Sequence, residues 1–186
     1  VHRLDRDTSG VIVVAKRRSI ASALGKLFAT RAVKKTYWAV VKGVPKPPQG
    51  RIDVPLLKDQ GPDGDRVRAG DKNDEKAQHA ITYFAVVDQA PPITAWVSLK
   101  PVTGRQHQLR AHMAYIGHPI LGDEKYDGNA DMPEGISKKL HLHARRIVFP
   151  HPREGVVDIS AELPAHMRET WNAFGFDPDR YEADVE

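Results

Sequence analysis

Short runs of β-branched and aromatic residues, most of them bounded by Gly or Pro, recur along the chain and limit the folds open to it. The clearest pair is AITYFAVV (80–87) and TAWVSLK (94–100), which flank a turn containing Ala90, Pro91 and Pro92. Two such runs around a short turn predict a β-hairpin. Similar reasoning predicts a buried strand at GVIVVAK (10–16). It also predicts strands later in the chain, in the segments 36–43, 143–152 and 156–160.

Apolar residues at helical spacing separate these strands. We expect helices carrying Ile20, Leu24, Leu27 and Phe28 after a Ser19 cap, then Leu109, Met113 and Ile116 before Gly117, and finally Met167, Trp171 and Phe174 after Leu163-Pro164. The segment 58–76 is rich in Asp, Gly and Lys and is expected to form an exposed, mobile loop. Neighbouring strands connect as hairpins, so the sequence predicts an α+β fold with a largely antiparallel sheet and helices packed on it.

The length of 186 residues suits one domain with a substantial core. We expect a domain over residues 1–174 and an acidic tail over 175–186. The chain has no cysteine, which excludes disulfides and thiolate chemistry. Its apolar runs fall short of the roughly 18 residues that a membrane span requires, so no membrane partner is expected.

Positive charge is concentrated in the first part of the sequence. Residues 1–51 hold twelve Lys or Arg against only Asp5 and Asp7, a net charge of +10, whereas the remainder holds sixteen against twenty-two acidic residues, a net charge of −6. A strongly basic segment is typical of a surface that binds a polyanion, most often nucleic acid. The alternative is a solvated surface that acidic neighbours balance after folding.

Five histidines cluster in the second half, at His107, His112, His118, His141 and His143. His107 and His112 are five residues apart, so a helix places them off a common face, unlike the i, i+4 pair of many zinc enzymes. We therefore expect ordinary hydrogen-bonded histidines and no metal site.

Arg110 follows Leu109, a position expected to face the core, so its guanidinium is expected to be partly drawn inside. A partly buried arginine needs a carboxylate or another anion beside it. Asp5 is the candidate partner, and the alternative is a surface arginine on an amphipathic helix.

Three segments resemble the RluA-type pseudouridine synthases. HRLDRDTSG (2–10) is similar to the family's H-R-L-D-x-x-T-S-G motif, and KKTYWAVVKG (34–43) to its K-x-Y-x-A-x-V-x-G segment. TGRQHQLRAHMAYIGHPILGD (103–123) is similar to a third family block. The segments occur in the family's order, and the resemblance runs from residue 1 to about residue 160.

The resemblance implies the pseudouridine synthase catalytic fold and an enzyme that isomerises uridine to pseudouridine within RNA. It implies that Asp5 is the catalytic carboxylate, acting either as a nucleophile or as a base on the sugar. Tyr37 corresponds to the tyrosine that stacks on the target base and helps to remove the C5 proton. Arg110 corresponds to the ion partner of Asp5, and Arg3 to the residue that enters the RNA where the uridine is flipped out.

Further contacts to the RNA are expected from the same motifs, at His2, Thr8, Arg105, His107 and Gln108. The reaction implies no cofactor and no metal. The expected partner is ribosomal RNA, of the large subunit first, with transfer RNA second, and the expected enzyme is a cytoplasmic monomer. The resemblance also implies that the family's preceding segment, and the S4-like RNA-binding domain of many members, lie outside this sequence.

Two other classes of protein stay open at this point. A non-catalytic RNA-binding module on the same scaffold would not need Asp5, Tyr37 and Arg110 together. A carboxylate-dependent glycoside hydrolase would need a second acid for the leaving group. Asp7 is near in sequence but is expected to point away.

Overall fold

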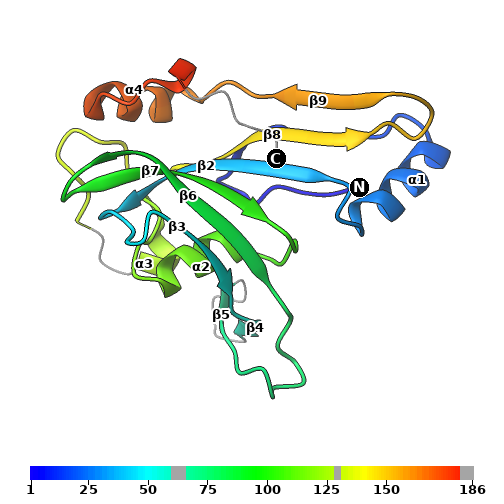
Figure 1. Cartoon of the computed structure of the whole chain (residues 1–186), viewed down its shortest axis with the longest axis horizontal. Coiled ribbons are helices and arrows are strands. Elements are labelled where there is room, and N and C mark those ends of the chain that lie inside the picture. Colours follow the sequence, from blue (N-terminus) through cyan, green and yellow to red (C-terminus); the bar gives the residue numbers. More distant parts are fainter. Residues whose placement is uncertain (60–65, 128–130, 181–186) are drawn as a thin grey trace.

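The computed structural model describes residues 1–59, 66–127 and 131–180 (Figure 1). In these ranges the elements are β1 (Ser9–Gly10), α1 (Arg18–Phe28), β2 (Lys34–Lys42), β3 (Gln49–Asp53), β4 (Leu56–Asp59), β5 (Arg66–Ala69), β6 (Ile81–Ala90), β7 (Thr94–Pro101), α2 (Gln108–Tyr115), α3 (Glu124–Asp127), β8 (Leu142–Pro150), β9 (Val156–Ser160), α4 (Ala165–Phe174) and the 3₁₀ turn η1 (Pro178–Arg180).

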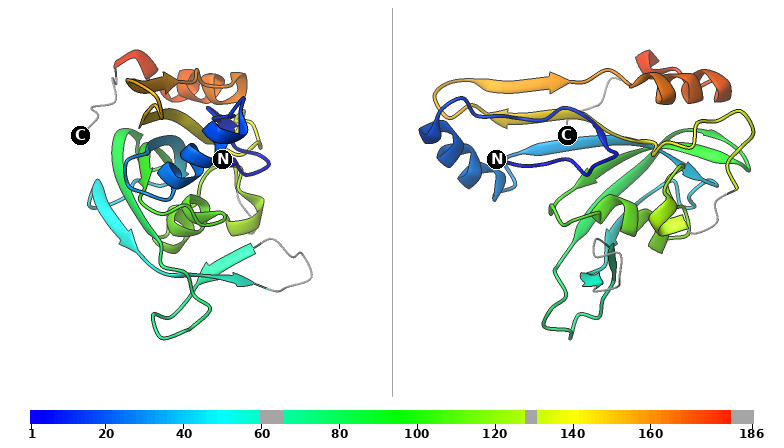
Figure 2. Two further views of the ribbon diagram at one scale, coloured as in Figure 1. Left: turned by 90° about the vertical axis from the view of Figure 1, so that its right-hand side faces the viewer. Right: turned by 180° about the vertical axis from the view of Figure 1, so that it is seen from behind.

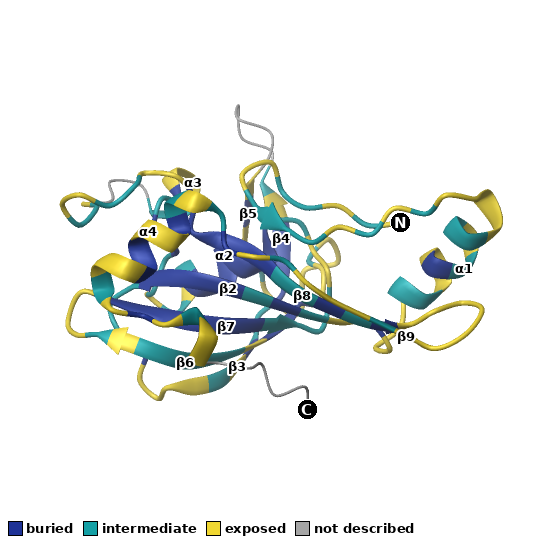
Figure 3. Cartoon of the chain, turned by 90° about the horizontal axis from the view of Figure 1, so that it is seen from above, coloured by how far each residue is buried: buried dark blue, intermediate teal, exposed yellow. Residues whose placement is uncertain are grey.

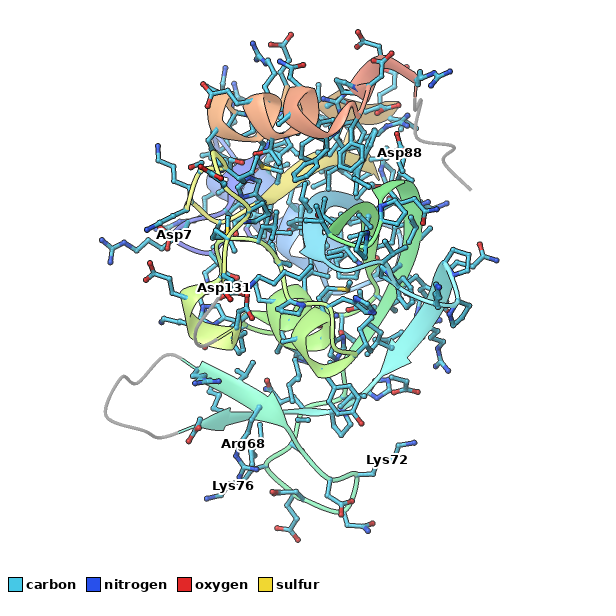
Figure 4. The ribbon with its side chains drawn as sticks, turned by 90° about the vertical axis from the view of Figure 1, so that its left-hand side faces the viewer. Asp7, Arg68, Lys72, Lys76, Asp88 and Asp131 are labelled. Carbon is cyan, nitrogen blue, oxygen red and sulfur yellow. The ribbon has the colours of Figure 1, made fainter. Side chains whose placement is uncertain are left out.

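Most of the strands form one seven-stranded sheet in the order β1-β8-β2-β7-β6-β3, and β9 also pairs with β8. Only β1 is parallel to its neighbour, and the other pairs in the sheet are antiparallel. Strands β4 and β5 form a separate two-stranded ribbon. The ribbon and the loop that follows it extend away from the sheet as an arm, whose Arg68, Lys72 and Lys76 lie on its outer part (Figure 4). The predicted α+β class with a largely antiparallel sheet is confirmed.

The sheet divides at one end. Pairing between β2 and β7 runs from Lys42 opposite Thr94 only as far as Tyr37 opposite Leu99. Beyond that point, the described residues of β2 pair with β8 alone, and the end of β7 pairs with β6 alone. The half made of β2, β8 and β9 therefore diverges from the half made of β6 and β7 (Figure 1). This division leaves the start of β2 and the end of β7 unpaired with each other.

Helix α2 packs on one face of the sheet, and α4 packs on the other. Alternate residues of β2 point to opposite faces, so Ala39 and Val41 pack with Leu109 and Met113 of α2. The intervening Trp38 and Val40 join a cluster of aromatic and aliphatic residues that includes Met167 and Trp171 of α4. Buried residues accordingly concentrate along β2, β7 and α2 (Figure 3).

The N-terminal segment and α1 lie beside the β2–β8 half, at the divided end of the sheet (Figure 2). Leu24 of α1 packs with Ile147 and Phe149 of β8. The predicted helix is confirmed, but it starts at Arg18, and no side-chain hydrogen bond caps it. The other two predicted helices and the predicted 80–100 hairpin are also confirmed.

Two predictions of local structure are wrong. Residues 10–16 do not form a buried strand: β1 ends at Gly10, Ile12 and Val14 are exposed, and Val11 and Val13 pack on the α1 cluster. The segment 58–76 is not simply a loop, since it contains the end of β4 and all of β5. Residues 60–65 of that segment lie outside the described ranges.

At the C-terminal end, Phe176 packs into the α4 core, so the packed region continues past residue 174. Residues 181–186 of the predicted tail are outside the described ranges, and the division at residue 174 stays a prediction. Among the described residues, no helix is long and apolar enough to cross a bilayer.

Candidate active site

A pocket of about 310 Å³ lies where the N-terminal segment crosses the divided end of the sheet. Its walls come from the N-terminal turn, the end of α1, the start of β2, the β7–α2 loop and the first turn of α2. The lining residues are Val1, His2, Arg3, Leu4, Asp5, Thr8, Phe28, Lys35, Tyr37, Pro101, Thr103, Gly104, Arg105, Gln108, Leu109 and Leu142.

The N-terminal motif folds into a turn that is tied to the body of the protein. The Thr8 amide donates to the Asp5 carbonyl at 2.9 Å, and the Ser9 hydroxyl bonds His143 Nδ1 at 2.8 Å. His2 stacks on Phe28, and its Nε2 accepts a hydrogen bond from the Val13 amide at 2.9 Å. The motif is therefore held at both ends, which fixes Asp5 at the pocket.

Asp5 is the only carboxylate among the described residues that line this pocket. Its side chain makes no hydrogen bond or ion pair with another described residue. Asp7 is exposed and points to the outside of the molecule (Figure 4). The described part of the pocket thus offers one acid and lacks the second one that a glycoside hydrolase uses.

Tyr37 lies on the pocket face of β2, one residue from Trp38 on the opposite face. Burial, with a further contribution from the charge of Asp5, raises the pKa of Tyr37 to about 12. The phenol is therefore protonated at neutral pH. The contribution from Asp5 also indicates that the carboxylate and the phenol are within electrostatic range.

The predicted ion pair between Arg110 and Asp5 is wrong for this structure. Arg110 donates from Nε to Asp123 Oδ2 at 2.9 Å and from a terminal nitrogen to Asp123 Oδ1 at 2.7 Å. Asp123 is 0% exposed, and the arginine is buried as expected. Burial lowers the pKa of Arg110, but the hydrogen bonds and charge of Asp123 outweigh it and raise the pKa, with a small further contribution from Asp5. Asp123, and not Asp5, pairs with Arg110 because Asp123 lies on the short segment that packs directly against α2.

A second layer supports this pair. The Arg110 guanidinium lies 5.2 Å from the centre of the Tyr126 ring, and the Tyr126 hydroxyl bonds His107 Nδ1 at 2.8 Å. His107 is buried, outside the pocket lining, and adopts a left-handed conformation with φ of 50°. The Val67 amide donates to the same hydroxyl, which connects the arm to the network. The predicted RNA contact of His107 is therefore not at the pocket surface.

Gln108 organises the β7–α2 loop. Its carbonyl oxygen accepts from the Thr103 hydroxyl at 2.6 Å and from the Arg105 amide at 3.1 Å. Its amide nitrogen donates to Ile81 and Thr82, so the side chain has all its partners within the protein. Gln108 therefore shapes the wall of the pocket. Arg105 is exposed at the same wall, with its Nε donating to the His79 carbonyl.

Besides Asp5, three polar side chains around the pocket have no such partners among the described residues. The Thr8 hydroxyl is buried without a hydrogen bond to any described residue. Lys35 lines the pocket without an ion pair within the described ranges, and burial lowers its pKa. Arg3 is exposed at the pocket mouth. The sequence reading missed Lys35, Asp123 and Tyr126, although Lys35 and Asp123 lie within the motifs quoted above.

The clustered histidines take separate hydrogen-bonding roles. His112 bonds Thr82 and the Val54 carbonyl, and His141 bonds Thr170 and the Lys139 carbonyl. His143 bonds the Ala161 carbonyl as well as Ser9. Over the described ranges, no group of three or more His, Asp or Glu side chains is arranged to hold a metal ion.

Comparison with known proteins connects this pocket to a family. The profile described as RNA pseudouridylate synthase matches residues 1–115. The "Dual-specificity RNA pseudouridine synthase RluA" of Salmonella typhi is 44% identical over 157 residues, which cover 83% of this chain and 68% of that protein. The "Ribosomal large subunit pseudouridine synthase C" of Haemophilus ducreyi is 37% identical over 172 residues, covering 90% of this chain and 52% of that protein.

A solved structure shares the fold. "Human RNA Pseudouridylate Synthase Domain Containing 4" superposes with a TM-score of 0.77 at 32% sequence identity, covering 94% of this chain and 74% of the human one. With the profile, the relatives and the shared fold in agreement, this chain belongs to the RNA pseudouridylate synthase family.

Proposed function

We propose that this enzyme converts uridine to pseudouridine at specific positions of a structured RNA, with Asp5 as the catalytic carboxylate. The observation that carries the proposal is the position of Asp5. It is the single acid among the described lining residues of a pocket built from the family's motifs, and its side chain is uncommitted. A binding module without catalysis would have no need for an uncommitted carboxylate there, because a negative charge repels RNA.

The reaction rearranges two bonds without adding or removing atoms. The bond between N1 of uracil and C1′ of ribose breaks, the detached base turns, and C5 bonds to C1′. The proton on C5 is lost and N1 gains one. Asp5 acts at the sugar, by adding to it or by taking a proton from it. The walls of the pocket keep the detached uracil beside C1′.

Tyr37 forms the platform for the base. A neutral phenol stacks on uracil without adding a second charge next to Asp5, and stacking of a base on an aromatic ring contributes about 1–3 kcal/mol. Because the phenol is protonated at neutral pH, it removes the C5 proton only as it passes its own proton onward. Asp5, within electrostatic range, is the acceptor that we propose.

Arg3 and the Arg110–Asp123 pair complete the site. Arg3, exposed at the mouth, enters the space that the flipped uridine leaves in the RNA. Extrusion of a base costs a few kcal/mol, least in loops and bulges. Arg110 acts on Asp5 from a fixed position, as a nearby positive charge and not as a hydrogen-bonded partner. The name of the Haemophilus ducreyi relative favours ribosomal RNA of the large subunit as the first substrate. Our proposal adds transfer RNA as the second substrate, the cytoplasm as the location and a monomer as the acting form.

The proposal is tested by mapping pseudouridines across cellular RNA with and without the gene, and then by assaying the purified protein on the RNA that changes. In that assay we expect Tyr37→Phe to bind the RNA within about three-fold of wild type, because the stacking ring remains. Turnover should stop after the glycosidic bond has broken. Wild-type turnover by Tyr37→Phe would leave stacking as the residue's only role, and an unchanged pseudouridine map would refute the proposal.

A further inference from the structure

A second opening lies on the other side of the sheet from Asp5. It has a volume of about 290 Å³ and occupies the gap where β2 and β7 cease to pair. We call it the split cleft and define it by Arg31, Lys34, Lys35, Arg51, Tyr83 and Lys100, which are among its lining residues.

The faces of the sheet place this cleft opposite the pocket. Tyr83 on β6 pairs with Lys100 on β7. Lys100 follows Leu99, which packs on the α2 face, so Lys100 and its partner Tyr83 lie on the opposite face. They therefore point to the face that α4 covers. The core beneath α4 is built around Trp38 and Trp96, farther along the same strands, so the helix leaves the divided end uncovered.

The cleft and the active-site pocket are adjacent. Lys35 and Pro101 line both of them, one on each side of the gap between β2 and β7. A chain that leaves the pocket past Lys35 therefore reaches the cleft within a short distance. On the far side the cleft continues into a shallow hollow of about 660 Å³, which shares Arg51, Tyr83 and Lys100 with it.

The charge of the cleft indicates the kind of ligand. Its described lining contains six Lys or Arg side chains and no Asp or Glu. Arg51 and Arg146 are paired with Asp53 and Asp158, which lie outside the lining. Arg31, Lys34 and Lys35 form no ion pair with any residue in the described ranges. Uncompensated cations that converge on one groove favour an anionic polymer.

An aromatic side chain stands among these cations. Tyr83 is 47% exposed, and it lines both the cleft and the hollow. A cationic groove with an exposed aromatic ring is the arrangement that holds single-stranded nucleic acid, with phosphates on the cations and a base on the ring.

We propose that the split cleft binds a single-stranded segment of the substrate RNA next to the target uridine. Lys35 holds the phosphate at the crossing between the two faces, Arg31 and Lys34 hold the next phosphates, and Tyr83 stacks on a base. The inference rests on RNA being the substrate, as proposed above, and assigns it a second contact on the opposite face of the sheet.

The test uses the purified chain and two fluorescent oligouridylates, one of about 4 nucleotides that fills the pocket and one of about 16 that can reach the cleft. We expect the double variant Arg31→Ala/Lys34→Ala to weaken binding of the long oligonucleotide at least ten-fold. It should also lower the slope of log affinity against log salt by about 1.4, because each phosphate contact to a single strand contributes about 0.7. Binding of the short oligonucleotide should stay unchanged.

The stacking contact is tested separately. Tyr83→Ala should weaken binding of the long oligonucleotide about five-fold or more, and Tyr83→Phe should restore it, because the ring alone provides stacking. Lys138→Ala and Tyr115→Ala are the matched controls, since both side chains are exposed and neither lines the pocket or the cleft. Both controls should bind like wild type.

The outcomes separate this inference from the proposed function. Equal binding of the long oligonucleotide by wild type and by the cleft variants would overturn the inference, and would leave the cleft to a protein partner. If pseudouridine still forms in that case, the proposed function survives alone. If the variants lose the long oligonucleotide selectively while wild type makes no pseudouridine in any cellular RNA, the inference stands and the proposed function fails.

Discussion

The polar residues of α2 have hydrogen-bonding partners within the protein, whereas several polar residues of the neighbouring pocket have none among the described residues. On α2, Gln108, Arg110 and His112 are buried, and each has its hydrogen bonds made within the protein. In the neighbouring pocket, the side chains of Asp5 and Lys35 have no hydrogen-bonding or ionic partner among the described residues. The difference separates groups that build the site from groups that are kept available for a substrate. Substitutions in the first set should cost stability, and substitutions in the second should cost function alone.

The largest expected effect is a loss of stability when one of the paired residues of α2 is replaced. Arg110→Met leaves the carboxylate of Asp123 buried without a partner, which should cost about 3–5 kcal/mol of unfolding free energy. Arg110→Lys should recover only part, since lysine cannot donate two parallel hydrogen bonds. The measurement is urea unfolding followed by circular dichroism.

A double variant provides the control for that prediction. Arg110→Met/Asp123→Leu removes both charges, so it should be more stable than Arg110→Met alone. If Arg110→Met unfolds like wild type, the buried pair does not have the role that the geometry gives it.

A pH dependence tests another paired residue, His141. Burial lowers the pKa of His141 to about 4, from a usual value of 6.5. In the folded protein His141 stays neutral until the pH approaches 4, whereas in the unfolded chain it gains a proton near pH 6.5. The stability of the folded state is therefore complete above pH 6.5 and is lost as the pH falls toward 4. We expect up to about 3 kcal/mol of loss over that window. His141→Gln should lose its share of the slope, and the slope is measured by urea unfolding at a series of pH values.

A smaller change in stability, of opposite sign, is expected at Lys35, one of the pocket residues without a partner among the described residues. Lys35→Met removes a desolvated charge, so it should raise the unfolding free energy by about 1 kcal/mol. It should also weaken RNA binding about ten-fold, because a phosphate contact in a partly buried site is lost. Unfolding and fluorescence anisotropy on the same preparation measure both. A loss of stability in this variant would place Lys35 with the paired residues and would contradict the comparison.

The sequence was sufficient to predict that two of the motifs meet at one pocket, but not how their side chains pair. HRLDRDTSG and GRQHQLR do lie around one pocket, as the resemblance implied. The partner of Arg110 was assigned wrongly because two carboxylates, Asp5 and Asp123, compete for one guanidinium. Only the packing of the segment after α2 decides between them.

The local errors have a similar origin. Residues 10–16 read as a continuous apolar run, yet alternate side chains are exposed, and the Val13 amide is bonded by the His2 ring instead of by a neighbouring strand. A side chain that replaces a strand in this way leaves no pattern in the sequence. The division of the sheet also escaped prediction, since it depends on which strands pair beyond Tyr37 and Leu99.

The most direct test of the account is a single-turnover assay of Asp5→Asn on the RNA identified by mapping, with RNA affinity and unfolding free energy measured on the same protein. The account predicts a fall in pseudouridine formation of more than about 1,000-fold, because the reacting carboxylate is gone. It also predicts affinity within about three-fold of wild type and undiminished stability, because Asp5 holds no other side chain in place. Substantial turnover by Asp5→Asn, or a loss of stability comparable to that of Arg110→Met, would contradict the account.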